Sequence, residues 1–190
     1  ASVEVIKQKG GEEALSGERF ALMGFMERHP RLYGLVDDDR IHEIPETLLG
    51  PDFYLSSTDG HIRSGDTPWH GRDRSSGSYQ EVPSCRVAMY FDSLNGENGA
   101  LRVIPSSHLL PFATWLSGLA GEDGMAEGGD LAYGAFGTAS TEVPCVILDS
   151  EPGDLVVFSE TVFHASFGGK ARLQITAQFG ANPTTEAHVA

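Results

Sequence analysis

The chain has 190 residues, of which 40% are hydrophobic and 21% charged, so it is long enough for one domain with a buried core. Its formal net charge is −14 and no Lys/Arg cluster stands out, which argues against phosphate backbones and anionic membranes as partners. The N-terminal residues do not form a secretion signal and no apolar run reaches membrane-spanning length. We therefore expect a cytoplasmic protein that binds neither nucleic acid nor membrane. Cys85 and Cys145 lack metal-binding spacing and are expected to be reduced thiols.

Residues 1–50 favour helix. Within Phe20–Met26, apolar residues recur at spacings of three and four, which predicts a helix that Pro30 ends or kinks. A second short helix is predicted at Ile44–Leu49, with Gly50-Pro51 as its stop.

From Phe53 onward the sequence predicts short strands separated by Gly, Pro, Ser, Asn and Asp. The predicted strands are Phe53–Ser57, His61–Arg63, Cys85–Phe91, Leu101–Ile104, Val143–Leu148, Leu155–Phe158 and Ala171–Phe179. Many short strands after a helical start are typical of a mainly β fold, a β-sandwich or jelly roll with helices packed on one sheet.

Residues 116–144 form a long insertion rich in Gly, Ala, Ser and acidic residues. A segment of this length without predicted structure is either a flexible, disordered stretch or a functional lid.

Hydrophobic and polar residues alternate in the last predicted strand. One face carries Leu173, Ile175, Ala177 and Phe179, and the other carries Arg172, Gln174, Thr176 and Gln178. An antiparallel sheet with one solvated face gives this pattern. A polar barrel interior is the alternative, and it is preferred only if the histidines point into that interior.

Two histidines lie in distinctive settings. His70 follows Asp-Thr-Pro-Trp and precedes Asp73 by three residues, and His164 follows an apolar strand. A histidine with a nearby carboxylate, together with a distant histidine, is the ligand set of a non-haem iron(II) site with one open face. Arg172 follows eight residues after His164 and could anchor a dicarboxylate. The pattern indicates an oxygenase.

Other residues allow plainer interpretations. Trp69 is more simply a core aromatic residue than a platform for substrate. Arg63 and Arg86 can meet an acidic substrate or pair with carboxylates, and pairing is preferred. His61 has no partner spacing and is expected at the surface or in a turn.

Three segments of residues 48–176 resemble the phytanoyl-CoA dioxygenase family of iron(II)- and 2-oxoglutarate-dependent oxygenases. They are Gly65-Asp-Thr-Pro-Trp-His70, the run Asn95-Gly-Glu-Asn-Gly-Ala-Leu-Arg-Val-Ile-Pro-Ser-Ser-His108, and Pro152-Gly-Asp through His164 to Arg172. The second segment is similar to the family signature except that Ser106 stands where Gly is usual. The resemblance implies a double-stranded β-helix core at residues 51–180 within a single domain, residues 1–190.

The resemblance also implies roles for matching positions. His70 and His164 would be the histidine ligands of Fe(II), and Arg172 would pair with the distal carboxylate of 2-oxoglutarate. Gln174 and Thr176, on the face of Arg172, are candidates to line the co-substrate pocket, and Tyr90 to donate a hydrogen bond there. Alternatively, these polar residues simply lie on the solvent-exposed surface.

The chain departs from the family at the carboxylate ligand. The family acid lies two residues after the first histidine, where this chain has Arg72, and the acid here is Asp73. On a regular strand Asp73 would face away from His70, and a β-bulge at Gly71 would restore its direction. We predict the triad His70, Asp73 and His164. A two-histidine site with a bound halide, as in 2-oxoglutarate-dependent halogenases, and a non-catalytic site are the alternatives.

The predicted function is that of an Fe(II)/2-oxoglutarate-dependent dioxygenase that uses O₂ and hydroxylates a small molecule, with release of succinate and CO₂. The alternative is a non-catalytic jelly-roll protein that binds a metal or ligand. The chain is short for the family, which favours a small or exposed substrate, or a pocket completed by a second copy in a homo-oligomer.

Overall fold

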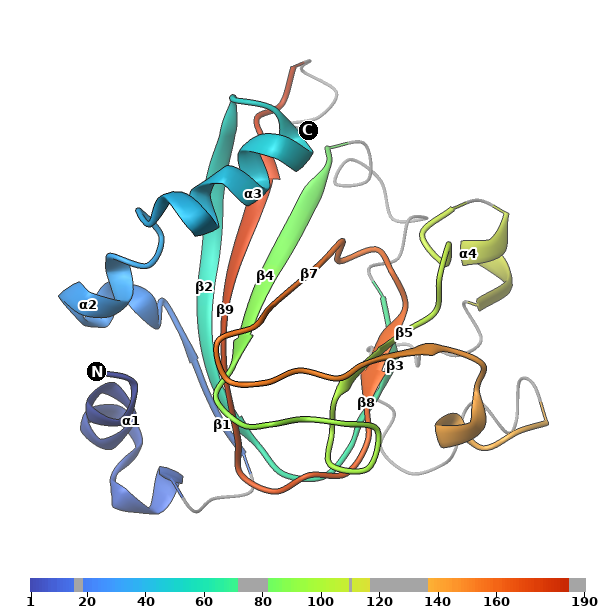
Figure 1. The fold of residues 1–190 in the computed structure, drawn as a ribbon, viewed down its shortest axis with the longest axis horizontal. Helices are drawn as coiled ribbons and strands as arrows, with labels where there is room; N and C mark the ends of the chain where they lie inside the picture. The colour runs from blue at the N-terminus through green and yellow to red at the C-terminus, as the bar shows by residue number, and fades with distance from the viewer. Residues whose placement is uncertain (16–18, 72–81, 110, 117–136, 185–190) are drawn as a thin grey trace.

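The computed structural model describes residues 1–15, 19–71, 82–109, 111–116 and 137–184. Within this part of the chain two antiparallel sheets face each other, and helices cover the outer face of the larger sheet (Figure 1). The larger sheet has the order β1-β2-β9-β4-β7, and the smaller has the order β3-β8-β5-β6. The strands are β1 (Arg19–Met23), β2 (Phe53–Arg63), β3 (Thr67–His70), β4 (Ser84–Tyr90), β5 (Leu101–Val103), β6 (Val146–Leu148), β7 (Leu155–Phe158), β8 (His164–Ser166) and β9 (Arg172–Ala181). This is the predicted jelly roll with N-terminal helices.

The helices are short. They are α1 (Ser2–Gly10), α2 (Pro30–Tyr33), α3 (Asp39–Leu49) and α4 (Phe112–Trp115). The amide of Arg40 donates to the Asp38 carboxylate at the start of α3, and Gly50 ends α3 with a φ of 88°. No helix in the described ranges has the length and apolar character needed to cross a membrane.

Two expectations for the N-terminal part were wrong. Most of the helix predicted at Phe20–Met26 is instead part of β1 (Arg19–Met23), an edge strand paired with β2, and Met26 begins a short 3₁₀ turn, Met26–Arg28. Phe20 and Leu22 are two residues apart, so both point to the same face of a strand and pack on the core. Pairing with β2 therefore decides the structure here, although the spacing of the apolar residues also fits a helix. Pro30 does not end a helix but begins α2, where its missing N–H costs nothing.

The strand predictions were mostly confirmed, with differences in length. Phe53–Ser57 and His61–Arg63 are parts of the single strand β2, and the strand predicted at Val143–Leu148 is only β6. The sequence did not predict β3 and β8, which carry the two histidines.

The insertion expected at residues 116–144 is described only at its ends. Leu116 and Val143 are buried in one hydrophobic cluster, and a 3₁₀ turn occupies Ser140–Glu142. The carbonyl of Ser140 accepts a hydrogen bond of 2.8 Å from Nε1 of Trp69, which is a core residue as predicted. Residues 117–136, where a flexible stretch or lid was expected, lie outside the described residues.

The main core lies between the helices and the larger sheet. Its sheet side includes Ile175, Ala177 and Phe179 of β9, which are 0–1% exposed. A second cluster around Trp69 and Phe163 covers the outer face of the smaller sheet. The opposite faces of the two sheets are therefore turned toward each other.

Candidate active site between the two sheets

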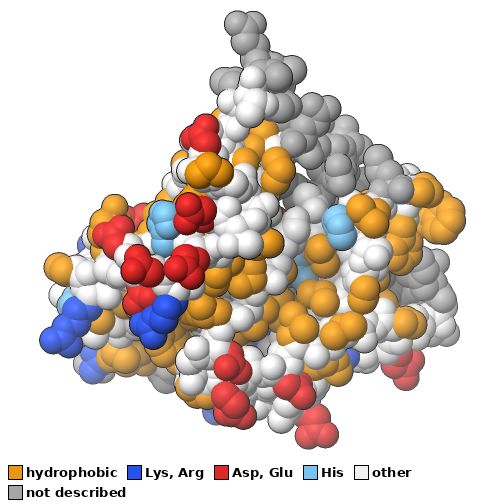
Figure 2. Space-filling model, turned by 45° about the horizontal axis from the view of Figure 1, so that its top comes forward, with side chains coloured by type: hydrophobic (Ala, Val, Ile, Leu, Met, Phe, Trp, Pro, Cys, Tyr) orange, Lys and Arg blue, Asp and Glu red, His pale blue; other side chains and the backbone are white. Residues whose placement is uncertain are grey.

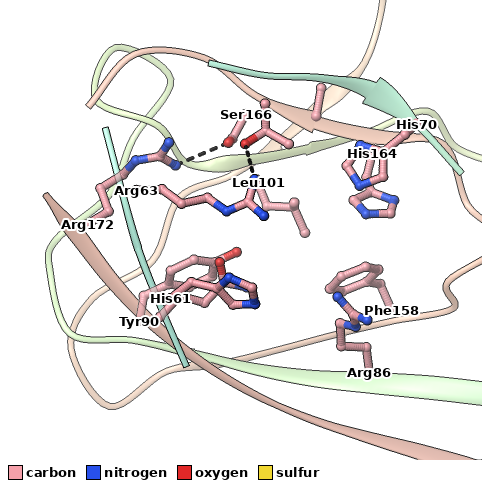
Figure 3. A pocket seen from close by; sticks show the side chains of 13 residues that line it. His61, Arg63, His70, Arg86, Tyr90, Leu101, Phe158, His164, Ser166 and Arg172 are labelled. Carbon is pink, nitrogen blue, oxygen red and sulfur yellow. Dashed lines mark hydrogen bonds between the residues drawn. The ribbon is translucent and has the colours of Figure 1, made fainter. Parts of the chain in front are cut away.

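A cavity lies between the facing sheets, and its lining is mostly polar (Figure 3). With its open mouth it comprises about 540 Å³. The lining residues are His61, Arg63, Thr67, His70, Arg86, Tyr90, Leu101, Phe158, His164, Ala165, Ser166, Arg172 and Gln174. The polar face of β9 thus turns inward at Arg172 and Gln174, which favours the polar interior over a solvated face.

His70 and His164 come together at one side of the cavity. They are directly opposed in the β3–β8 pair, and their ring centroids are 4.1 Å apart. Nδ1 of His70 lies 2.8 Å from the Pro68 carbonyl, and Nδ1 of His164 lies 2.7 Å from the Val162 carbonyl. Because a carbonyl only accepts, each Nδ1 carries the proton and each Nε2 keeps a free lone pair. Metal-ligating histidines are commonly oriented in this way.

The two imidazoles are held neutral. Burial, together with the nearby His70, lowers the pKa of His164 to about 3. Burial is also the main cause of the lowered pKa of His70. A neutral imidazole is the form that binds a metal.

The third predicted ligand, Asp73, lies outside the described residues. Among the residues that the structure does describe, no group of three His, Cys, Asp or Glu side chains could hold a metal. The register of β3 is irregular, but the irregularity lies between Thr67 and His70 and thus before the histidine. The bulge predicted at Gly71 would have to extend into residues 72 and 73, which are not described.

Arg172 is fixed by the backbone around it. Its Nη1 donates to the Gly99 carbonyl at 2.8 Å and to Ser166 Oγ at 3.1 Å, and its Nη2 donates to the Gly65 carbonyl at 2.7 Å. Its Nε is buried without a partner among the described residues. The backbone of Gly99 and Gly169 covers this nitrogen, so the rest of the guanidinium, which lines the cavity, is the part that a carboxylate could meet.

The other predicted co-substrate residues divide into two groups. Tyr90 and Gln174 line the cavity, and burial raises the pKa of Tyr90 to about 12, so its hydroxyl remains a donor. Thr176 does not line the cavity: it is 1% exposed, and its hydroxyl donates to the Asp59 carboxylate at 3.3 Å. Thr176 shares the face of Arg172 but lies nearer the middle of the sheet, where that carboxylate occupies its hydroxyl.

His61 was expected at the surface and instead lines the cavity. Burial, followed by the charge of Arg63, lowers its pKa, and its Nδ1 is buried without a partner among the described residues. The sequence contained one signal for this position. His61 and Arg63 are two residues apart on one strand, and residues i and i+2 share a face of a strand.

Arg86 fulfils the pairing that the sequence favoured. Its Nη2 lies 2.5 Å from the Glu160 carboxylate and 3.4 Å from the Gln178 side chain. This ion pair connects β4 with the turn that precedes β8.

The chain is similar to a known family and to solved structures. The family described as phytanoyl-CoA dioxygenase (PhyH) matches residues 8–172. No curated protein sequence matches the chain.

Three solved structures share the fold. The 2-oxoglutarate-dependent carbocyclase SnoK from nogalamycin biosynthesis is 18% identical, with a TM-score of 0.65, over 94% of this chain and 71% of its own. EctD from S. alaskensis, solved with 2-oxoglutarate and 5-hydroxyectoine, is 18% identical, with a TM-score of 0.61, over 85% of this chain. HygX from Streptomyces hygroscopicus, with nickel and 2-oxoglutarate bound, is 15% identical, with a TM-score of 0.62, over 98% of this chain and 81% of its own. The present chain spans only 56% of the EctD chain.

Proposed function

The chain belongs to the phytanoyl-CoA dioxygenase family, whose members use iron(II), 2-oxoglutarate and O₂, and from this premise we propose that it hydroxylates a small molecule. The observation that carries the proposal is the pair of neutral histidines, His70 and His164, in a cavity that Arg172 also lines. Two neutral imidazoles whose ring centroids are 4.1 Å apart fit a metal, and a guanidinium that lines the same cavity fits a carboxylate.

His70 and His164 would hold the metal, and we propose Asp73 as the third ligand from the family motif. Iron(II) held there supplies the activation of O₂ that accompanies the oxidative decarboxylation of 2-oxoglutarate to succinate and CO₂. The backbone carbonyls of Pro68 and Val162 fix both imidazoles before any metal arrives, so little side-chain order has to be gained on binding.

Arg172 would orient the co-substrate through its distal carboxylate, and the Tyr90 hydroxyl could donate a further hydrogen bond. Phe158 packs beside His164 at a ring separation of 5.0 Å, and with Leu101 it gives the cavity apolar walls near the histidines. Walls of this kind exclude water and strengthen the electrostatic interactions inside.

Hydroxylation of a small molecule is the outcome we propose, and the structure of EctD with 5-hydroxyectoine supports it. The carbocyclase SnoK has the same fold, so ring closure is the outcome to test beside it. Product analysis by mass spectrometry separates the two, because hydroxylation adds one oxygen atom and ring closure removes two hydrogens.

The first experiment is an anaerobic titration of the protein with iron(II) and 2-oxoglutarate, followed by the visible charge-transfer band of the chelated complex. We expect the band in the wild type and its loss in His164→Ala and His70→Ala. His42→Ala, which removes an exposed histidine on α3, is the matched control and should keep the band.

Asp73→Ala decides the third ligand in the same titration. Loss of the band would support the triad, whereas a band that survives would indicate the two-histidine, halide-binding site. A wild-type protein without the band would contradict the oxygenase proposal and favour the non-catalytic binding protein.

A further inference from the structure

Three arginines form one row across the larger sheet. Arg19 of β1 is paired with Arg63 of β2, and Arg63 is paired on its other side with Arg172 of β9. Residues directly opposite in neighbouring strands point to the same face, and like charges in such positions destabilise a sheet. Arg63 and Arg172 both line the cavity, so the repulsion is focused there.

The surroundings partly compensate the charge of Arg172. Two carbonyls and the Ser166 hydroxyl accept its hydrogen bonds, and Asp66 and Asp92 lie near enough to favour its charged form. Under the proposed function its guanidinium, which lines the cavity, takes one carboxylate of 2-oxoglutarate.

Arg63 has no comparable compensation. Its Nη1 donates to Thr67 Oγ1 over a long 3.3 Å, and it forms no ion pair with a carboxylate of the described residues. Burial lowers its pKa, and the charges of Arg19, Arg172 and Arg86 lower it further. Its guanidinium extends into the cavity between Arg172 and the histidine pair (Figure 3).

His61 adds a second polar group beside it. Since His61 and Arg63 are two residues apart on β2, both project from the same face into the cavity. Because its imidazole lines the cavity, it can contact a ligand that is bound beside Arg63.

We propose that Arg63, assisted by His61, binds an anionic group of the primary substrate, which makes that substrate a small carboxylic acid. The inference rests on the proposed function, because one carboxylate is already assigned to Arg172. Of the three cavity arginines, Arg86 is paired with Glu160 and Arg172 is assigned to the co-substrate, which leaves Arg63 for a second acid.

The first arm of the test separates substrate from co-substrate. The Kd of 2-oxoglutarate is measured by anaerobic titration with iron(II) in the wild type, Arg63→Gln, Arg63→Lys and Arg172→Gln. We expect Arg172→Gln to weaken binding about tenfold or more, and Arg63→Gln to change it by less than about threefold. Arg19→Gln removes an exposed charge from the same row and is the control.

The second arm uses probes of defined chemistry and does not depend on turnover. Protein loaded with zinc(II) and saturating 2-oxoglutarate is mixed with small monocarboxylates, such as benzoate, and with the neutral amide of each, such as benzamide. We expect carboxylates, but not amides, to raise Tm in the wild type and in Arg19→Gln. The advantage of the carboxylate should be lost in Arg63→Gln and partly kept in Arg63→Lys.

Three results would overturn the inference. The first is an equal response to carboxylates and amides, and the second is a carboxylate preference that persists in Arg63→Gln. The third is a loss of 2-oxoglutarate affinity in Arg63→Gln like that in Arg172→Gln, which would assign Arg63 to the co-substrate and leave the proposed function intact. Absence of 2-oxoglutarate binding in the wild type would overturn both proposals.

Discussion

Ser106 and Ser107 lie side by side in the turn after β5, and their side chains are expected to have opposite effects on stability. Ser106 has a φ of 62°, a conformation that glycine adopts freely and other residues adopt at a cost. We expect Ser106→Gly to raise the free energy of unfolding by about 0.5–1 kcal/mol in urea denaturation.

Ser107 is the matched comparison. It is 0% exposed, and its Oγ accepts a 2.8 Å hydrogen bond from the amide of Phe163, the residue before His164. Ser107→Ala should leave that buried donor without a partner and lower the stability by about 1–3 kcal/mol. A stabilising Ser107→Ala, or a destabilising Ser106→Gly, would contradict this account of the turn.

At the scale of elements, the loop between β4 and β5 holds the arginine of β9 in place. Gly99 has a φ of 101°, and a Cβ there would lie 2.6 Å from the guanidinium carbon of Arg172. We expect Gly99→Ala to displace Arg172 and to weaken 2-oxoglutarate binding about tenfold, although Gly99 has no side chain to contact the ligand. The measurement is the anaerobic titration.

Gly153 provides the control for backbone strain. It has a φ of 105°, and apart from its chain neighbours no atom of the described residues lies within 4 Å of the place that a Cβ would take. Gly153→Ala therefore carries a similar conformational cost without touching Arg172. If both variants weakened 2-oxoglutarate binding equally, general destabilisation would explain the loss.

The sequence predicted long elements better than short ones. Alternation over β9 was sufficient to identify both faces of the strand, including the cavity residues Arg172 and Gln174. Strands β3 and β8 have four and three residues, too few for alternation to be visible. Their histidines were instead identified from the carboxylate near His70, the apolar strand before His164 and motifs that resemble a family.

Other parts of the site depend on tertiary pairing, which a sequence pattern does not contain. Arg63 was expected to pair with a carboxylate, and its position opposite Arg172 became visible only in the β2–β9 register. Thr176 was expected in the cavity, but the neighbouring strand brings Asp59 to its hydroxyl. The ligand Asp73 stays a prediction.

For the whole molecule, the larger sheet separates stability from function, since one face packs on the helices and the other lines the cavity. Ile175, which is 0% exposed, and Gln174, which lines the cavity, are adjacent on β9 and test this division. Ile175→Ala should cost about 2–5 kcal/mol of stability and leave the 2-oxoglutarate Kd of the folded protein unchanged.

Gln174→Ala should behave in the opposite way. We expect a change in stability within about 0.5 kcal/mol and a loss of about threefold or more in 2-oxoglutarate affinity. Denaturation and titration of the same two preparations provide both readouts. The division of roles between the two faces would be refuted if each variant changed both the stability and the 2-oxoglutarate affinity.

The cavity arginines Arg63 and Arg172 lie in a protein whose net charge is −14, and acidic side chains gather over its helical side (Figure 2). A dianion approaching from solvent is therefore repelled at long range and attracted only near the mouth. At physiological ionic strength the screening length is about 8 Å. Salt therefore weakens the long-range repulsion by the surface more than the short-range attraction by the buried guanidinium groups. The association rate of 2-oxoglutarate should consequently rise with moderate salt, the reverse of the behaviour of electrostatically steered enzymes.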